Sequence, residues 1–289
     1  MAGKQALNIV KLKKMKQEGQ RISMITAYDF PTATLAEEAG IDMILVGDSL
    51  GNMVLGYQST LPVTIDDMFY HTRAVVRGAG HTFVVADMPF MTYHGSTDES
   101  LRHVARLMQE GQASAVKLEG GKEIVPIVEK IVKAGVPVLG HIGLTPQSVN
   151  QIGGYRIQGK DAADAKRLLE EAKALEAAGA FAVVLELVTE QVAEMITKEL
   201  TIPTIGIGAG PHCDGQVLVF HDVFQYASPY RDKRFVKTYG DIGTIVRDGI
   251  KAYVADVKTG AFPDEGNSFR ADDDVVGQLY GAVKEGEEQ

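Results

Sequence analysis

The sequence predicts an α/β protein of the (β/α)8 (TIM) barrel class, with an N-terminal helix and a C-terminal helical extension. Three observations support this class. Short apolar runs rich in β-forming residues recur eight times, with helical patterns between them. Four of these runs end at an acid: Asp48, Asp87, Glu119 and Glu186. Three helix-to-strand junctions share an Ala-Gly pair followed by an apolar residue. Because parallel strands need crossover helices, eight such units can close into a barrel.

A doubly wound open sheet is the main alternative. Such a sheet usually needs fewer strands for a chain of this length, and it gathers its ligands at one switch point. Here the acids follow several different strands, which favours the barrel.

The first element expected is a short basic helix within residues 1–21, where lysines alternate with apolar residues. A solvated helix face explains these lysines better than nucleic-acid binding does. Residues 23–27 are predicted to form the first strand. Asp29, with Pro31 after it, marks the start of a helix that Gly40 ends.

The alternation continues to residue 219. The remaining strands are expected at residues 42–46, 83–86, 115–118, 137–140, 181–185, 203–206 and 215–219. A loop from Gly51 to Val63 follows the second strand. Helical segments are expected to begin near Thr64, Ser96, Lys122, Thr145, Asp161 and Thr189, the first two with an acid three residues later, as in a capping box.

The C-terminal part has a different pattern. Residues 241–257 predict one more helix, and residues 263–289 are acidic and contain glycine. No Pro/Gly/Ser-rich or charged linker divides the chain before this point. We therefore expect one barrel domain with its N-terminal helix over residues 1–262, and an acidic tail over 263–289. The acidic runs in this tail fit a solvated segment better than a metal site.

Composition limits the function classes. The 289 residues carry 29 Lys and Arg against 38 Asp and Glu, a net charge of −9, which argues against nucleic acid as the main partner. Cys213 is the single cysteine, so the chain forms no internal disulfide and no cysteine-based zinc site. No signal peptide or apolar run of about 20 residues is present, so we expect a cytoplasmic protein with small-molecule substrates and no membrane partner.

The strand-end acids are the candidate functional residues, because barrel enzymes keep their chemistry at the C-terminal ends of the strands. Asp48, Asp87 and Glu119 follow successive strands and offer hard oxygen donors, which suit Mg²⁺. Each acid could instead cap the helix behind its strand. Lys117 lies two residues before Glu119 and therefore faces the same side of the strand, where it can neutralise the acids or hold a substrate anion.

Glu186 and His141 are the candidates for proton transfer. Glu186 follows the sixth strand in an apolar setting, so its pKa is expected to be raised and its carboxylate can act as a general base away from the metal. For His141, after the fifth strand, a structural role and a catalytic one are equally open. The glycines of residues 206–210 lack the full dinucleotide fingerprint, and more simply let the backbone turn tightly or approach a flat ligand.

Several runs together resemble one enzyme family. These are Thr26–Asp29, Val46–Gly51, Asp87–Phe90, Val116–Gly120, Gly140–Gln147 and Ile205–Gly210. Over residues from about 8 to 262 the chain resembles the ketopantoate hydroxymethyltransferases. The resemblance implies a TIM barrel with one Mg²⁺ per subunit, a homo-oligomer that is usually decameric, and hydroxymethyl transfer from 5,10-methylenetetrahydrofolate to α-ketoisovalerate through a Mg-stabilised enolate.

The resemblance also implies roles for individual residues. Asp48 and Asp87 match the metal positions of the family and contact the substrate, and Glu119 matches an accessory metal-site acid. Ser49 and Lys117 match substrate contacts, and Glu186 matches the proton acceptor.

Two alternative functions stay open. One is a Mg-dependent keto-acid lyase or mutase of the isocitrate lyase/phosphoenolpyruvate mutase type, although such enzymes usually show a Lys-Lys-Cys-Gly-His-like run that this sequence lacks. The other is a non-catalytic barrel that binds a metabolite.

Overall fold

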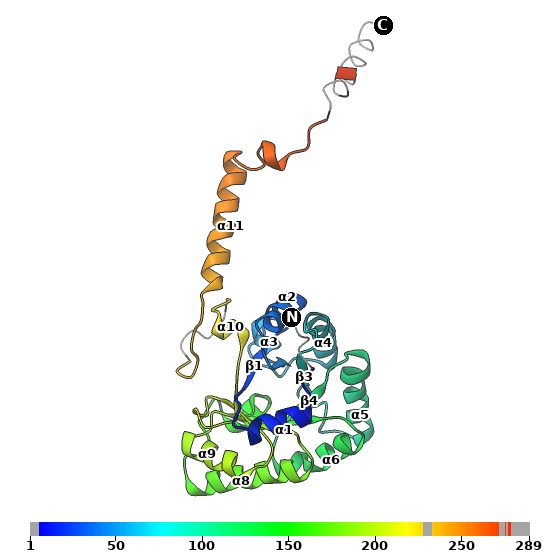
Figure 1. Ribbon diagram of the computed structural model, residues 1–289, viewed down its shortest axis with the longest axis vertical. Coiled ribbons are helices and arrows are strands. Elements are labelled where there is room, and N and C mark those ends of the chain that lie inside the picture. The colour runs from blue at the N-terminus through cyan, green and yellow to red at the C-terminus, as the bar shows by residue number, and fades with distance from the viewer. Residues whose placement is uncertain (1–5, 228–232, 272–274, 276, 279–289) are drawn as a thin grey trace. The chain divides into compact units, whose positions relative to one another are not determined.

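The computed structural model describes residues 6–227, 233–271, 275, 277 and 278 (Figure 1). It contains two compact units, Met1–Gly240 and Asp241–Gln289, which are described separately below. The expected division between residues 262 and 263 stays a prediction. Within the described residues, no helix is both long and apolar enough to cross a membrane.

The first unit is a closed barrel of eight parallel strands, which confirms the predicted fold class. The strands are β1 (Ile22–Thr26), β2 (Met43–Val46), β3 (Phe83–Asp87), β4 (Ala115–Glu119), β5 (Val138–Gly143), β6 (Ala182–Glu186), β7 (Thr204–Ile207) and β8 (Gly215–Leu218). Each strand pairs with the next along the chain, and β8 pairs with β1 to close the ring.

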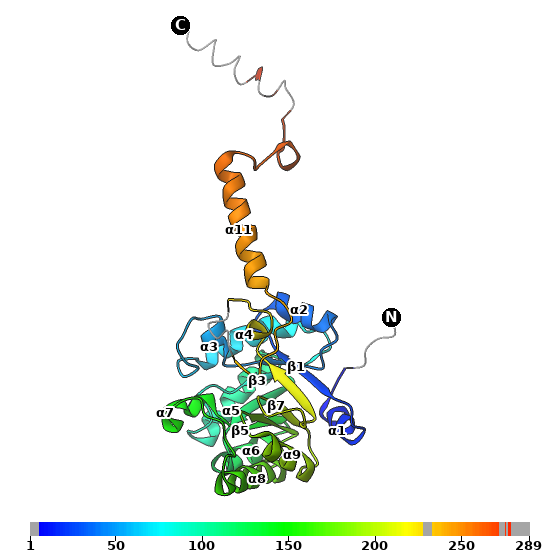
Figure 2. The ribbon, with the colours of Figure 1, turned by 90° about the vertical axis from the view of Figure 1, so that its left-hand side faces the viewer.

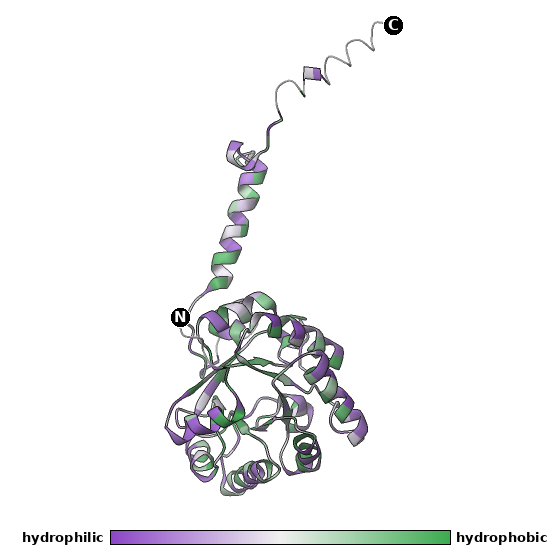
Figure 3. Cartoon of the chain, turned by 45° about the vertical axis from the view of Figure 1, so that its right-hand side comes forward, coloured by the Kyte–Doolittle hydropathy of each residue, from purple (hydrophilic) through white to green (hydrophobic). Residues whose placement is uncertain are grey.

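The strand sequences explain this arrangement, because most strand residues are buried on both faces. Alternate side chains such as Met43, Leu45 and Val85 pack together inside the barrel. Their neighbours, such as Ile44 and Val84, pack against the surrounding helices. Figure 3 shows hydrophobic residues concentrated along the strands.

The N-terminal helix α1 (Ile9–Gln17) belongs to the barrel unit, as predicted. Its Leu12 is fully buried and packs with Ile22 and Met24 of β1, so α1 lies against the end of the barrel where β1 begins (Figure 2). Lys16 fastens the helix there, with its Nζ 2.9 Å from Asp214 Oδ2. Among the basic residues of α1, Lys16 thus forms an ion pair with the barrel, and Lys13 and Lys14 are exposed to solvent.

The other helices of this unit follow the strands in order. They are α2 (Phe30–Glu38), α3 (Leu50–Met53), α4 (Ile65–Gly78), α5 (Thr97–Ala105), α6 (Val125–Lys133), α7 (Val149–Ile152), α8 (Ala162–Ala177), α9 (Glu190–Glu199) and α10 (Phe220–Val223). The predicted caps Asp29, Thr64, Ser96 and Asp161 accept the expected backbone N–H bonds. Thr189 begins α9 without a cap bond, since its hydroxyl donates to Gly159 O.

Two features differ from the expected elements. Helix α3 occupies the start of the region predicted as a loop from Gly51 to Val63. A π-helix (Arg106–Glu110) continues α5 as far as Gly111. Residues 208–214, between β7 and β8, contain no helix, and none was predicted there, because glycines and a proline favour turns.

The second unit contains helix α11 (Ile242–Thr259), close to the predicted bounds. Asp241 caps it, with Oδ1 accepting from the Thr244 N–H, and Gly260 ends it in the left-handed conformation. Hydrophobic and hydrophilic residues alternate along this helix in Figure 3. The predicted acidic runs Asp272–Asp274 and Glu285–Glu288 lie outside the described residues.

Candidate active site at the C-terminal end of the barrel

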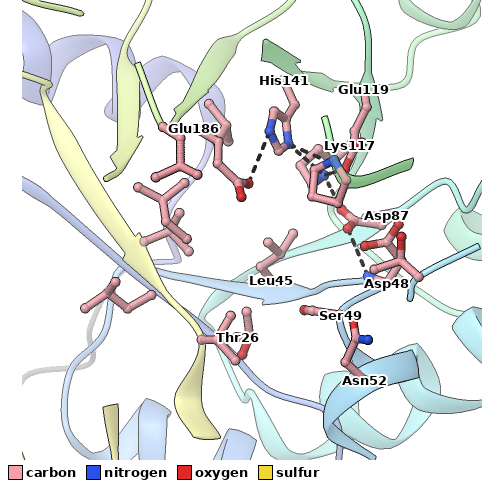
Figure 4. Close-up of a pocket in the computed structure, with 18 of the residues that line it drawn as sticks. Thr26, Leu45, Asp48, Ser49, Asn52, Asp87, Lys117, Glu119, His141 and Glu186 are labelled. Atoms are coloured by element: carbon pink, nitrogen blue, oxygen red, sulfur yellow. Dashed lines mark hydrogen bonds and ion pairs between the residues drawn. The ribbon is translucent and has the colours of Figure 1, made fainter. Parts of the chain in front are cut away.

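A pocket of about 340 Å³ opens at the C-terminal ends of the strands. All six predicted site residues line it, as does His141: Asp48, Ser49, Asp87, Lys117, Glu119 and Glu186. Figure 4 shows Asp48, Asp87 and Glu119 grouped around Lys117, with His141 between this group and Glu186. The strand ends therefore bring together residues that are up to 138 positions apart in the sequence (Asp48 to Glu186).

The register of the strands places Asp87 and Lys117 side by side, because they are paired positions of β3 and β4. Lys117 Nζ lies 3.2 Å from Asp87 Oδ1, 3.4 Å from Glu119 Oε1 and 3.2 Å from His141 Nδ1. Only 4% of its side chain is exposed. Burial lowers the pKa of Lys117, but the surrounding carboxylates outweigh this effect, so its pKa stands above the ordinary value. Lys117 is thus a fixed positive charge.

The acids around Lys117 are held by further contacts. The Asp48 N–H donates to Asp87 Oδ2 at 3.0 Å, which joins the ends of β2 and β3. Burial raises the pKa of Asp87 to about 7 and that of Glu119 to about 8, against the opposing effect of Lys117. The pKa of Asp48 is raised for the same reasons. Several acids beside one lysine therefore favour an additional positive charge.

Gln147 is a site residue to which the sequence analysis gave no role. Its Nε2 donates to Asp48 Oδ2 at 2.8 Å, and its backbone N–H donates to Glu119 Oε2 at 3.0 Å. The Tyr93 hydroxyl donates to Gln147 Oε1 at 2.6 Å. The only sequence signal was a polar residue just after the Thr-Pro pair that follows β5. Gln147 links two of the acids and fixes their orientation.

Ser49 lies at the rim of the acid cluster. Its Oγ is 2.7 Å from the Tyr28 hydroxyl, and Tyr28 is buried. Burial raises the pKa of Tyr28 above its ordinary value, although the Ser49 contact opposes this. Tyr28 thereby fixes the position of the Ser49 hydroxyl beside the pocket.

His141 occupies the centre of the pocket wall and is neutral. Its Nε2 donates to Leu144 O at 2.8 Å, so its Nδ1 carries the lone pair and accepts from Lys117. Burial, and secondly the Lys117 charge, hold the pKa of His141 well below its ordinary value. This geometry favours the structural role for His141, because both ring nitrogens are engaged.

Glu186 stands apart from the acid cluster. Its Oε2 lies 3.4 Å from His141 Nε2, and 16% of its side chain is exposed. Burial raises the pKa of Glu186 to about 7, as the sequence predicted in direction, and Lys117 and then Lys233 oppose the rise. Near neutral pH this carboxylate is therefore poised to take up or release a proton.

The backbone around Glu186 is tightly built. The Leu144 N–H donates to Glu186 O at 2.8 Å. Gly143 has φ +94, and a Cβ there would lie 2.3 Å from Glu186 O, so only glycine allows this approach. Leu187, directly after Glu186, has φ 47, an uncommon conformation for a leucine that is typical of functional sites.

The acid cluster fits a divalent cation. Asp87 Oδ1 is buried and makes no hydrogen bond, although it lies near the Lys117 ammonium. Both oxygens of Glu119 are engaged, by Lys117 and by Gln147. Among the described residues, no three His, Cys, Asp or Glu side chains form a ready-made metal site. Two carboxylates that leave positions for substrate and water suit Mg²⁺ better than Zn²⁺.

Comparisons with known proteins point to one enzyme family. A family model described as "Ketopantoate hydroxymethyltransferase" matches residues 6–265. The 3-methyl-2-oxobutanoate hydroxymethyltransferase of Halalkalibacterium halodurans is 57% identical over 271 residues, which cover 94% of this chain and 97% of the relative. The enzyme of the same name from Thermoanaerobacter pseudethanolicus is 56% identical over 258 residues, 89% of this chain and 94% of the relative.

Solved structures share the fold at low sequence identity. Phosphonopyruvate hydrolase in complex with oxalate and Mg²⁺ has a TM-score of 0.58 and 13% identity, covering 96% of this chain and 95% of that one. A 2,3-dimethylmalate lyase of the PEP mutase/isocitrate lyase superfamily has a TM-score of 0.57 and 17% identity, with 96% coverage of both chains. At this identity the likeness concerns the barrel alone.

Proposed function

This chain belongs to the ketopantoate hydroxymethyltransferase family, and on that premise we propose that it transfers a hydroxymethyl group from 5,10-methylenetetrahydrofolate to α-ketoisovalerate. The product is ketopantoate, and the reaction opens pantothenate biosynthesis. The observation that carries the proposal is the division of the pocket: a carboxylate with a pKa of about 7, Glu186, faces a cluster of acids around Lys117. A keto acid bound at the cluster would present its C3 hydrogen to that base.

The binding half of the pocket is the acid cluster. Asp48 and Asp87 would hold one Mg²⁺ per subunit, with Glu119 acting through water because its own oxygens are engaged. When bound, the ion supplies positive charge at the keto oxygen and so acidifies the C3 hydrogen. Lys117 and Ser49 contact the substrate, and the fixed charge of Lys117 favours the negative charge that develops during the reaction.

The proton-transfer half is Glu186. As a carboxylate it accepts the C3 proton, and it then holds that proton while C3 bonds to the one-carbon unit of the folate. Water supplies the hydroxyl oxygen, and both bonds from this carbon to the folate nitrogens break. The proton held by Glu186 and the remaining proton of the water pass to these nitrogens, and tetrahydrofolate leaves. His141 does not compete as a base, because its Nδ1 lone pair already accepts from Lys117. Its ring lies between Glu186 and the acid cluster (Figure 4).

The test is a turnover assay with both substrates. We expect ketopantoate, detected by mass spectrometry, only when α-ketoisovalerate, methylenetetrahydrofolate and Mg²⁺ are all present. Formation of a cleavage product from a keto acid without folate would instead favour a lyase, and binding without any turnover would favour a non-catalytic barrel. We also propose a homo-oligomer, with a decamer as the form that the family resemblance implies, which a light-scattering mass would test.

A further inference from the structure

The pocket has a second wall, which the acids do not occupy. It is apolar and is formed by Val184, Leu187, Ile207, Val217 and Phe235. Figure 4 shows side chains made only of carbon on the side away from Asp48 and Asp87. A small keto acid held at the acid cluster would leave this wall uncovered. The wall therefore provides room for a second, larger and less polar molecule.

The apolar wall begins beside the proposed base. Ile207 of β7 is the paired position of Glu186 on β6, and Leu187 follows Glu186 directly. A ring lying on this wall would thus be adjacent to the place where Glu186 removes a proton. That is where the carbon donor must be for the new bond to form.

Phe235 is the aromatic residue of this wall, and a glycine makes room for it. Gly208 has φ +64, and a Cβ at Gly208 would come within 3.2 Å of the Phe235 ring and 2.7 Å of Leu187. The glycines after β7 were expected to let the backbone approach a flat ligand. At Gly208 the flat group that the backbone approaches is the Phe235 ring. Phe235 is thereby held at the edge of the pocket.

Residues 233–239, here called the strap, are fastened on both sides of Phe235. Lys233 Nζ lies 2.7 Å from Oδ2 of the buried Asp222, and the Tyr239 N–H donates to Val223 O at 2.8 Å. The strap is therefore attached to the segment α10 that follows β8. Its Phe235 is a fixed part of the pocket and not a surface ring that happens to lie nearby.

We infer that the wall around Phe235 is the binding site for the flat reduced pterin ring of the one-carbon donor, and that Phe235 is its main aromatic contact. The inference rests on the proposed function. A flat heterocycle gains from contact with an aromatic ring on an apolar surface, whereas the acid cluster would repel the donor's carboxylates. The two substrates then occupy opposite walls and meet beside Glu186.

The experiment compares Phe235→Ala with Phe235→Tyr, which keeps the ring, and with Tyr239→Ala as control. Tyr239 lies in the same strap, but this residue is 66% exposed and does not line the pocket. Two quantities are measured: the dissociation constant for tetrahydrofolate, by calorimetry, and the exchange of the C3 hydrogen of α-ketoisovalerate in D₂O, which needs no folate. Loss of an aromatic stacking surface is expected to weaken tetrahydrofolate binding roughly 5- to 100-fold.

The inference is supported if Phe235→Ala binds tetrahydrofolate more weakly but exchanges the C3 hydrogen at the wild-type rate. Phe235→Tyr and Tyr239→Ala should both bind tetrahydrofolate with wild-type affinity. Unchanged tetrahydrofolate binding in Phe235→Ala overturns it. So does an equal loss of exchange and of tetrahydrofolate binding, which would make Phe235 a support of the whole pocket. If the wild-type protein neither exchanges the hydrogen nor binds tetrahydrofolate, the proposed function fails, and this inference fails with it.

Discussion

The acid cluster around Lys117 and the carboxylate of Glu186 share one pocket but differ in how firmly each is held. In the cluster, Glu119 is engaged through both oxygens and Asp48 is bound by Gln147. Glu186 lies 3.4 Å from His141 Nε2, but that N–H already donates to Leu144 O. The cluster is thus fixed by its neighbours, whereas the Glu186 side chain keeps freedom to exchange a proton.

This difference shows how burial serves two purposes at one site. Burial raises the pKa of Asp87 and of Glu186 to about 7 in each case. For Asp87 the neighbouring Lys117 ammonium lies at 3.2 Å, so the carboxylate is suited to binding positive charge. For Glu186 no such close ammonium is present among its described contacts, so the raised pKa suits proton transfer. The distance of each carboxylate from the Lys117 ammonium therefore decides whether it binds positive charge or transfers a proton.

The largest effect is expected in the acid cluster around Lys117. Asp87→Ala removes the acceptor of the Asp48 N–H and an anionic neighbour of Lys117. We expect turnover to fall below detection, together with loss of Mg²⁺-dependent binding of α-ketoisovalerate, while circular dichroism stays that of the wild type. Asp66→Ala is the control, because Asp66 is a surface acid with a 77% exposed side chain. Unfolding of Asp87→Ala would show that Asp87 serves the fold instead.

The next largest effect is expected at Glu186, which its neighbours hold less firmly than the acid cluster. Glu186→Gln keeps the shape of the side chain but removes the base, so we expect turnover to fall about 10²–10⁴-fold with nearly unchanged affinity for Mg²⁺ and α-ketoisovalerate. Proton NMR in D₂O should show that exchange of the C3 hydrogen is lost as well. Glu190→Gln, an exposed acid on α9, is the control. Exchange at the wild-type rate in Glu186→Gln would mean that another group is the base.

The sequence predicted the barrel because its strands are buried on both faces. Runs such as Met43–Val46 are continuously apolar, and the caps Thr64 and Ser96 act through local bonds that a sequence pattern reveals. Helix α3 was missed, since four residues are too few to show a helical period.

The candidate site was predictable only in part. Strand-end acids could be identified, because the C-terminal ends of barrel strands converge wherever the strands lie in the sequence. Gln147 could not, since its role depends on bonds to Asp48 and Glu119, which are 99 and 28 residues away. The neutral state of His141 likewise follows from its contacts with Leu144 and Lys117 and not from its position after a strand.

A smaller effect on the acid cluster is expected from a change at Gln147. Gln147→Leu preserves bulk but removes the Nε2 donor to Asp48 and the acceptor of the Tyr93 hydroxyl. Because a hydrogen bond to a charged group is worth about 1.5–3 kcal/mol, turnover at limiting Mg²⁺ should fall roughly 10- to 100-fold. Gln151→Leu, on the exposed face of α7, is the matched control. Unchanged Mg²⁺ dependence would show that Asp48 is oriented without Gln147.

The smallest expected effect is a shift in the pH dependence that Glu186 sets. Since its pKa is about 7 and only the carboxylate accepts a proton, C3-hydrogen exchange should rise through pH 7 and fall about 10-fold for each pH unit below it. Lys233 is one of the two ammonium groups that oppose the rise in this pKa. Lys233→Met removes a charge that favours the carboxylate, so the midpoint should move to higher pH. Lys237→Met, in the same strap but outside the pocket lining, should leave it in place. A midpoint that moves down in Lys233→Met, or equally in both variants, would show that the Lys233 ammonium does not set the proton affinity of Glu186.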